Sequence, residues 1–321
     1  MATVADFLAE WRSDSPYIEA HTSGSTGTPK VIRLLKSDMR LSARATNAFF
    51  GINAASVLVL PLSVGYIAGK MMAVRADEAA CTLVELPVSN RVVIDRATDL
   101  LAIVPSQAES LLTQSDAPRL VRHLLLGGAP VSPDLARRLT DAGFDAYIGY
   151  GMTETCSHVA LRTLADNVFA AMPGITFSTD GRDCLVIHSD KFSWRELVTN
   201  DVVRLHDERH FEWLGRADNV INSGGVKIHP EQLESALRMM LPDMPPFYIT
   251  KEPHPLWGEA VVLVAEGRRD DSLLDRIGSV IADRRQLPRR AIFVDWLPST
   301  PNGGKLCRLT PDRLADRESR S

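Results

Sequence analysis

The chain contains few cysteines and no long apolar run. Its four cysteines are far apart in the sequence and form no CxxC pair, which excludes a cysteine zinc site and a disulfide framework. No apolar stretch reaches the length of about 20 residues that a membrane-spanning helix needs. The first residues, Met1 to Trp11, lack the basic start and apolar core of a signal peptide. We therefore expect a reduced, cytoplasmic protein that does not bind membranes.

An excess of charge of one sign is also missing. The formal net charge is −4, from 36 basic and 40 acidic residues. A chain so balanced has no overall attraction for nucleic acid or for anionic membranes, so any anion-binding site must be local. The hydrophobic content of 45% is that of an ordinary globular protein, and the length of 321 residues predicts two domains.

The most distinctive stretch is H-T-S-G-S-T-G-T-P-K, from His21 to Lys30. Glycines let the backbone approach a ligand closely, successive N–H groups can converge on an anion, and the lysine adds a compact positive charge. These features favour a polyphosphate, whereas the alternative is a Ser/Gly-rich hairpin turn without a ligand. It is not a Walker loop, because Pro29 precedes the lysine and no Ser or Thr follows it. The candidate ligand-binding residues are Thr22, Ser23, Gly24, Ser25, Thr26, Gly27 and Lys30.

Strand and helix patterns alternate in the first half of the chain. Tyr17–Ala20 and Val31–Leu34 flank the loop and are both expected to be strands. Ser37 is expected to cap a helix that Gly51 ends. Further strands are expected at 57–62, 81–86, 100–104, 124–126 and 146–150, with helices at 5–11, 66–76, 107–112 and from Ser132-Pro133 to Gly143. Continuous apolar strands in βαβ units predict a mainly parallel sheet covered on both faces.

The pattern changes after about residue 173, where two hairpins are expected, the first around Asp180-Gly181. The polar segment Gly215–Asp218 follows, and there we place a domain boundary. Beyond it, a helix after Pro230, strands at 247–250, 260–265 and 292–296 and a helix at 273–281 are expected. The sequence thus predicts an α/β protein with a large domain, residues 1–217, and a small α+β domain, residues 218–321.

A second motif, G-Y-G-M-T-E-T, ends the strand predicted at 146–150. Ligands bind at the carboxyl ends of parallel strands. An aromatic ring there can stack on a base, a threonine can bond a phosphate and a carboxylate can hold Mg²⁺. The alternative is an ordinary turn between a strand and a loop.

T-S-G-S-T-G-T-P-K resembles the phosphate-loop signature of the adenylate-forming superfamily, which contains acyl- and aryl-CoA synthetases, nonribosomal peptide adenylation domains and luciferases. G-Y-G-M-T-E-T is similar to the aromatic-Gly-x-Thr-Glu motif of the same superfamily. The resemblance implies an acid–thiol ligase that uses ATP, Mg²⁺ and coenzyme A and works through an acyl-adenylate. The phosphate loop would hold the β- and γ-phosphates.

The resemblance also implies roles for residues in the second motif. Tyr150 would stack on adenine, Thr153 would contact the α-phosphate and Glu154 would bind magnesium. Other residues would line the nucleotide site: Gly128, Ala129, Gly151 and Met152. A tight turn explains Gly127-Gly128 equally well. Thr199-Asn200-Asp201 is similar to a Thr-Gly-Asp motif whose aspartate, here Asp201, bonds the ribose hydroxyls, although Asn200 replaces the glycine.

The segment Gly215–Ile228 resembles the hinge between the two domains of the superfamily. Arg216 would reach the ribose or phosphate, and Asp218 would be the pivot. Gly224, Gly225 and Lys227 would line the path of the pantetheine arm of CoA. A polar interdomain linker is the alternative for the first four residues of the segment.

P-S-T-P-N-G-G-K, which ends at Lys305, resembles the C-terminal loop that delivers the adenylation lysine. A lone lysine in such a loop is otherwise a solvated tip, and the second glycine departs from the usual single Gly-Lys. Arg284-Arg285 and Arg289-Arg290 form a basic cluster, which either is a solvated face or receives the 3′-phosphate of CoA.

Three runs look most like the o-succinylbenzoate–CoA ligases of menaquinone synthesis: G-Y-G-M-T-E-T, I-N-S-G-G-V-K-I-H-P-E and P-L-x-x-x-Y-I-A-G-K-M-M. The second carboxylate of such an acid needs a cationic or donor partner, and the candidates are Lys70, His158 and Arg162. Two alternatives stay open, an adenylating enzyme that loads a carrier protein and a non-catalytic nucleotide-binding homologue. Only 21 residues precede the phosphate loop, far fewer than in most members. We therefore expect part of the parallel-sheet layer to be uncovered, and with it a homodimer or another partner surface.

Overall fold

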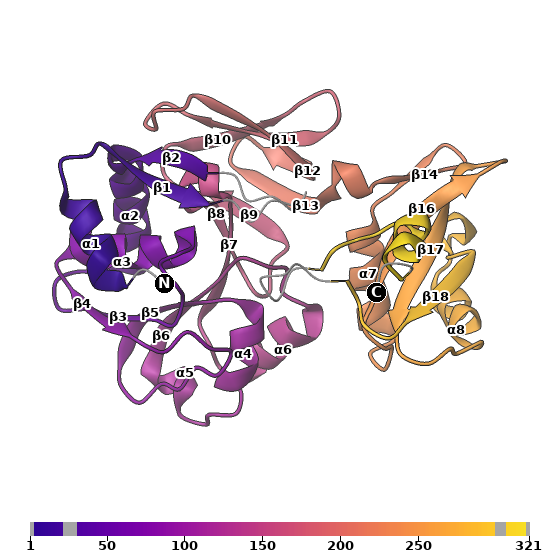
Figure 1. Ribbon diagram of the computed structural model, residues 1–321, viewed down its shortest axis with the longest axis horizontal. Coiled ribbons are helices and arrows are strands. Elements are labelled where there is room, and N and C mark those ends of the chain that lie inside the picture. Colours follow the sequence, from indigo (N-terminus) through magenta and orange to yellow (C-terminus); the bar gives the residue numbers. More distant parts are fainter. Residues whose placement is uncertain (1–2, 22–30, 299–305, 319–321) are drawn as a thin grey trace. The chain divides into compact units, whose positions relative to one another are not determined.

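The computed structural model describes residues 3–21, 31–298 and 306–318, and these form two compact units (Figure 1). The first unit comprises Met1–Ser178, Val186–Val198 and Leu205–Glu212. The second unit comprises Thr179–Leu185, Thr199–Arg204 and Trp213–Ser321. These units are defined by which residues pack together, and each contains more than one stretch of the chain. The predicted domain boundary after residue 217 stays a prediction.

The first unit contains alternating helices and strands. Its helices are α1 (Val4–Arg12), α2 (Lys36–Phe50), α3 (Ile67–Ala79), α4 (Pro105–Leu111), α5 (Ala117–Leu120) and α6 (Pro133–Asp141). Its strands are β1 (Tyr17–His21), β2 (Val31–Leu35), β3 (Val57–Leu60), β4 (Thr82–Glu85), β5 (Thr98–Ile103), β6 (Val121–Leu126), β7 (Ala146–Gly151), β8 (His158–Thr163) and β9 (Val168–Ala171). Four more strands carry residues of both units: β10 (Ile175–Thr179), β11 (Cys184–Ser189), β12 (Glu196–Asp207) and β13 (His210–Arg216).

One sheet has the strand order β10-β11-β12-β13-β9-β8-β7-β6-β5-β3-β4. The strands from β4 to β7 pair in parallel, whereas β7 with β8, β8 with β9 and β9 with β13 pair antiparallel. The predicted α/β class is confirmed, but the sheet is mixed. Short turns let the later strands pair one after another, whereas each parallel pair needs a crossover helix.

Helices cover both faces of the parallel strands, as predicted. Figure 1 shows α1, α2 and α3 on one side of these strands and α4, α5 and α6 on the other. Right-handed crossovers account for this division, because β3 leads outward to β4 and β5 leads the opposite way to β6 and β7. The strand side chains between these layers, such as Leu58, Leu100 and Leu124, are fully buried.

The start of α2 differs from the prediction, and its end agrees. Leu35 occupies the N-cap without a side-chain hydrogen bond, so the prediction of Ser37 as the cap is wrong. The first turn is instead held from outside, because Lys36 N donates to the carbonyl of Pro16 at 2.9 Å and its Nζ to the carbonyl of Ser13 at 2.7 Å. Gly51 ends the helix with a φ of +66°, which glycine adopts readily.

The helix α6 begins where its sequence predicts. The Oγ of Ser132 accepts a 3.1 Å hydrogen bond from the main-chain N of Leu135, and Pro133 fills the first helical position. This arrangement satisfies one of the free donors at the helix start.

The second unit contains a five-stranded sheet in the order β15-β14-β17-β16, with β18 parallel to β17. Its strands are β14 (Ile221–Ser223), β15 (Val226–Ile228), β16 (Phe247–His254), β17 (Gly258–Glu266) and β18 (Arg290–Val294). Its helices are α7 (Pro230–Met240), α8 (Leu273–Val280) and α9 (Pro311–Glu318). Helices on a mainly antiparallel sheet confirm the predicted α+β domain.

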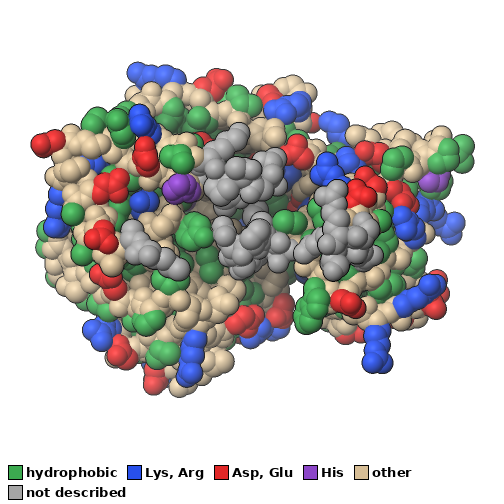
Figure 2. Space-filling view, in the orientation of Figure 1, with side chains coloured by type: hydrophobic (Ala, Val, Ile, Leu, Met, Phe, Trp, Pro, Cys, Tyr) green, Lys and Arg blue, Asp and Glu red, His purple; other side chains and the backbone are tan. Residues whose placement is uncertain are grey.

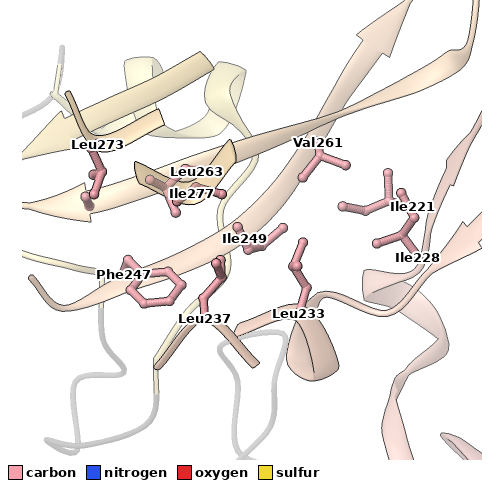
Figure 3. Packing of buried hydrophobic residues seen from close by; sticks show 11 residues of the cluster. Ile221, Ile228, Leu233, Leu237, Phe247, Ile249, Val261, Leu263, Leu273 and Ile277 are labelled. Atoms are coloured by element: carbon pink, nitrogen blue, oxygen red, sulfur yellow. The ribbon is translucent and has the colours of Figure 1, made fainter. Parts of the chain in front are cut away.

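A compact apolar cluster holds the second unit together. Figure 3 shows its side chains converging from α7, α8 and the central strands, with Leu237, Ile249 and Leu263 fully buried. The sequence prediction missed α5, β8, β9, β14, β15 and α9. Among the described helices, none is long and apolar enough to cross a membrane. On the face drawn in Figure 2, acidic and basic side chains are interspersed.

Candidate functional site

Two glycines in the last three residues of β7 pack against the chain at the start of β8. A β-carbon on Gly151 would overlap the carbonyl oxygen of Ser157, and one on Gly149 would lie 3.1 Å from the β-carbon of His158. The antiparallel pairing of β7 with β8 brings these backbones together. Glycine is therefore required where the chain turns into the Thr-Glu-Thr segment.

That segment, the 3₁₀ helix η1 (Thr153–Thr155), is fixed from within. The Oγ1 of the buried Thr155 accepts a 2.9 Å hydrogen bond from the main-chain N of Met152 and donates to the carbonyl of Ser157 at 2.6 Å. This leaves Thr153 half-buried and Glu154 exposed. No described residue pairs or hydrogen-bonds with the Glu154 side chain, so its carboxylate has room for an external ligand.

The ring of Tyr150 rests against an aromatic cluster. It packs edge-on against Phe211 at 5.0 Å between ring centroids and is tilted against Phe169 at 5.7 Å. Phe177 also packs edge-on against Phe211, at 4.9 Å. The cluster positions the half-buried tyrosine ring at the end of β7, where the predicted adenine would lie.

The glycine turn after β6 lies at the same sheet edge, since β6 and β7 pair in parallel with Leu126 opposite Ile148. Gly128 has a φ of +80° and Val104 would contact its β-carbon at 3.4 Å. Ala129 follows it, half-buried. The structure therefore brings the two predicted nucleotide-binding turns of the first unit to one edge of the sheet.

In the second unit, an ion-pair network joins three of the predicted residues. Nη1 of Arg216 lies 3.5 Å from Oδ1 of Asp201, and Nη2 lies 3.2 Å from Oδ2 of Asp218. Nδ2 of Asn200 lies 3.4 Å from the same Oδ2, and its Oδ1 accepts from Arg182 at 3.1 Å. The residue that replaces the expected glycine therefore also contacts the predicted pivot.

Gly224 and Gly225 form the two-residue turn between β14 and β15. Their φ values of +56° and +79° match the left-handed turn that such hairpins use. Lys227 makes an exposed ion pair with Asp183 at 3.4 Å. The hairpin explains both glycines, and the path of CoA past them stays a prediction.

No hydrogen bond or ion pair joins any two of the three predicted acid-binding residues, and each has other contacts. Nζ of Lys70 lies 4.7 Å from the ring centroid of Phe7, and burial lowers its pKa. Arg162 donates to the carbonyls of Thr163 and Asp166. His158 is buried, and its Nε2 lies 3.1 Å from Oγ1 of Thr46.

Arg75 is a further cation, which the sequence prediction missed. It contacts Ser157, two residues after the Thr-Glu-Thr turn. Its side chain is 2% exposed, and Nη2 donates to Oγ of Ser157 at 2.5 Å. Among the described residues, Nε has no hydrogen-bond partner and no carboxylate pairs with the guanidinium. Burial lowers its pKa to about 10. The signal in the sequence is a single arginine directly after the apolar run Met71–Val74.

Burial and Arg75 both act on the neighbouring histidine. Desolvation, followed by the positive charge of Arg75, lowers the pKa of His158 well below its usual value. Nδ1 of His158 lies 3.3 Å from the same Ser157 oxygen that Arg75 contacts. The histidine is therefore neutral at pH 7. The hydroxyl of Ser157 contacts two buried side chains, those of Arg75 and His158.

Several predicted residues lie outside the described part of the chain: Thr22, Ser23, Gly24, Ser25, Thr26, Gly27, Lys30 and Lys305. The two strands that flank the phosphate loop are confirmed, since β1 and β2 pair antiparallel with His21 opposite Val31. Among the described residues, no group of three or more His, Cys, Asp or Glu side chains forms a metal site.

The AMP-binding enzyme family matches residues 5–188 of the chain. A long-chain-fatty-acid–CoA ligase of Mycobacterium tuberculosis is 24% identical over 94% of this chain and 70% of its own length. A 2-succinylbenzoate–CoA ligase of Enterococcus faecalis is 23% identical over 88% of this chain and 66% of its own. The chain thus spans about two thirds of the length of these relatives.

Two solved structures have a similar fold. An acyl-CoA synthetase (AMP-forming)/AMP-acid ligase II-like protein from Dyadobacter fermentans is 33% identical, with a TM-score of 0.63, over 99% of this chain and 93% of its own. The o-succinylbenzoate CoA synthetase of Bacillus subtilis, in complex with ATP and magnesium, is 22% identical, with a TM-score of 0.75, over 90% of this chain and 68% of its own. The family match and the 33% identical structure show that the chain belongs to the AMP-binding enzyme family.

Proposed function

We propose that the protein joins a carboxylic acid to coenzyme A through an acyl-adenylate, and that the acid carries a second carboxylate, as o-succinylbenzoate does. The enzyme is an AMP-forming acid–thiol ligase that uses ATP, Mg²⁺ and CoA. A place in menaquinone synthesis follows if the acid is o-succinylbenzoate. The cytoplasmic location and the homodimer stay predictions.

The reaction has two steps. A carboxylate oxygen of the acid attacks the α-phosphorus of ATP, forming the acyl-adenylate and releasing pyrophosphate. The thiol of CoA then attacks the acyl carbon, forming the thioester and releasing AMP and a proton. Both steps depend mainly on positioning and on neutralising charge. Lys305 would neutralise charge in the first step, and Thr153 would contact the α-phosphate.

The residues at the end of β7 fit a magnesium ion. Mg²⁺ is usually held by one or two carboxylates together with substrate phosphates rather than by a cage of protein ligands. The exposed Glu154 supplies one such carboxylate, and no described residue competes for it. When bound, the ion would neutralise phosphate charge.

The observation that carries the choice of acid is the buried Arg75. A buried charge without an opposite charge is unfavourable, and its unused Nε leaves hydrogen-bonding capacity. Because Nη2 of Arg75 donates to Oγ of Ser157, the serine keeps its own hydrogen, which can go either to Nδ1 of His158, 3.3 Å away, or to an acceptor on the substrate. Ser157 is half-buried, three residues after Glu154. A second carboxylate on the acid would accept from Ser157 and supply the missing negative charge.

A screen of acids tests this proposal. Pyrophosphate release from the full chain with ATP, Mg²⁺ and CoA would be compared for o-succinylbenzoate, for benzoate and for a long-chain fatty acid. We expect the first acid to be preferred. Arg75→Met and Ser157→Ala should each raise KM for o-succinylbenzoate by about 10- to 100-fold, the worth of a charge-assisted hydrogen bond.

The matched control is Arg209→Met. Arg209 is half-buried in the first unit, whereas Arg75 is buried, and Arg209 donates to the carbonyls of Ile175 and Ala171. This variant should keep the preference between acids, with thermal unfolding as the check on folding. Equal use of all three acids, or equal losses for benzoate and o-succinylbenzoate, would contradict the choice of acid. Product formed only on a holo carrier protein would favour the carrier-loading alternative, and no pyrophosphate release with any acid would favour a non-catalytic nucleotide-binding homologue.

A further inference from the structure

One carboxylate in the second unit contacts three separate parts of the chain. Glu231 lies in the first turn of α7, with a side chain 10% exposed. Its Oε1 accepts a 2.5 Å hydrogen bond from Nδ2 of Asn219 and lies 3.4 Å from Nε of Arg308. Asn219 ends the 3₁₀ helix η2 (Ala217–Asn219), which contains the predicted pivot.

The same carboxylate packs against the start of the predicted hinge. Gly215 has a φ of +151°, and a β-carbon there would overlap Oε2 of Glu231. Oε2 is buried and has no hydrogen-bond partner within the described part of the chain. Glu231 therefore touches both ends of the segment 215–219, and any movement of that segment changes the surroundings of a buried carboxylate.

Arg308 links this carboxylate to the chain that follows Lys305. Its guanidinium pairs with Glu234 as well as Glu231, and its side chain is 16% exposed. It also donates to the carbonyl of Ile249 at 3.1 Å. These bonds hold residue 308, three positions after the predicted adenylation lysine, to α7 and β16.

We propose that Glu231 is a positioning residue that ties the hinge segment 215–219 to the chain following Lys305 during adenylation. The inference rests on the proposed function. Glu231 gains its full set of partners only when Asn219 and Arg308 approach it together, because each donor comes from a different segment. An unpaired buried carboxylate is unfavourable, so this arrangement is favoured over those that separate the donors.

A purely structural ion pair is the competing explanation. It would stabilise the second unit and affect both half-reactions alike through the amount of folded enzyme. Desolvation raises the pKa of Glu231, and its unsatisfied Oε2 shows that the site is not optimised for stability alone. The two explanations differ in which half-reaction is lost.

The first experiment measures each half-reaction separately in the full chain carrying Glu231→Gln. Adenylation is followed by ATP–pyrophosphate exchange, and thioester formation is followed from supplied acyl-adenylate and CoA. We expect adenylation to fall about 10- to 100-fold, as expected for a small misplacement of a reacting group, and thioester formation to change less than about threefold. The control is Glu252→Gln, which breaks a similar arginine pair with Arg290 in the same unit.

The second experiment needs no catalytic turnover. Amide hydrogen exchange should speed up in both 215–219 and 306–309 in Glu231→Gln, and in neither segment in Glu252→Gln. Asn219→Ala, which retains the Glu231–Arg308 pair, serves if Glu231→Gln does not fold, and it should speed exchange in both segments to a lesser degree.

The outcomes separate this inference from the proposed function. Equal losses in the two half-reactions, or faster exchange in only one of the two segments, would overturn the role of Glu231 in an active enzyme. A wild-type chain with no pyrophosphate exchange for any acid would overturn the proposed function, and the role of Glu231 in adenylation with it.

Discussion

The guanidinium of Arg216 lies between two carboxylates, with Nη1 3.5 Å from Oδ1 of Asp201 and Nη2 3.2 Å from Oδ2 of Asp218. Sequence resemblance assigns the first carboxylate to the ribose and the second to the hinge. One arginine therefore connects a predicted nucleotide ligand to the predicted pivot within the second unit. The predicted roles of Asp201 and Asp218 can be tested by separate substitutions.

Asp201→Ala should weaken ATP binding. If the carboxylate accepts hydrogen bonds from both ribose hydroxyls, its loss should raise KM for ATP by about 10- to 100-fold with a smaller change in kcat, since hydrogen bonds to charged groups are worth about 1.5–3 kcal/mol. Steady-state kinetics with 2′-deoxy-ATP is the control. The deoxy analogue should bind less well than ATP to the wild type and equally well to the variant. An unchanged KM for ATP would remove Asp201 from the ribose site.

Lys305→Ala should abolish acyl-adenylate formation and leave thioester formation from supplied acyl-adenylate largely intact. The charge of the lysine is needed only as pyrophosphate leaves, and losing such a donor costs about 10²–10³-fold in rate. Pyrophosphate exchange and single-turnover thioester formation measure the two steps. If both steps fell equally, the predicted role would be wrong.

Glu154→Gln should raise the magnesium concentration that turnover requires. The substitution keeps the shape of the side chain and removes the negative charge that a hard cation prefers. A magnesium titration of pyrophosphate release checks this, with Glu109→Gln as the control, because Glu109 is an exposed carboxylate that pairs with Arg138. Identical magnesium curves for the variant and the wild type would exclude Glu154 as a ligand.

His158 should make the protein less stable as the pH is lowered. Burial and Arg75 hold the pKa of His158 well below its ordinary 6.5, so below that pH the unfolded chain binds a proton that the folded chain does not. The contribution is absent above pH 6.5 and grows as the pH falls through 6.5 toward the folded pKa, by at most about 1.4 kcal/mol per pH unit.

Urea unfolding between about pH 7.5 and 5 measures this effect. His158→Gln keeps a polar side chain at the site and cannot take up the proton, so its free energy of unfolding should fall less steeply on acidification. His123→Gln is the control, because His123 lies beside Asp145, at 2.6 Å, rather than beside a buried cation. Parallel curves for His158→Gln and the wild type would show that the histidine does not titrate on unfolding.

Asp218→Pro should separate the two half-reactions. Proline fixes φ near −65° and removes a backbone donor, so it should hold the hinge in one orientation. Lys305 and the Gly224-Gly225 turn both belong to the predicted small domain, but they are predicted to act in different steps, so one orientation of this domain should not serve both. Such large rotations are absorbed by a few backbone dihedrals at a hinge. We expect adenylation to continue and thioester formation to fail in single-turnover measurements. Normal rates for both steps would argue against rotation about Asp218.

Local sequence signals determined most of the framework. Continuous apolar runs identified the central parallel strands β3, β5 and β6, because a strand buried on both faces has no polar side to show. Gly51 and Ser132 marked helix ends through their own backbone and side-chain chemistry. The Gly-Tyr-Gly and Thr-Glu residues predicted a turn at the end of β7, since each residue type acts on a conformation or a contact close to it in the chain, and the ligand-binding role of this turn stays a prediction.

Contacts between distant segments were decided only by the tertiary structure. Ser37 has the chemistry of a cap, yet the N-cap is Leu35, two residues earlier, because Pro16 and Ser13 satisfy the first turn of α2 from another part of the chain. Arg75 and Ser157 are 82 positions apart, so nothing near either residue predicts their hydrogen bond. Whether a cation is paired, buried or available depends on which segments pack around it, and packing over such separations is not encoded in any single stretch of sequence.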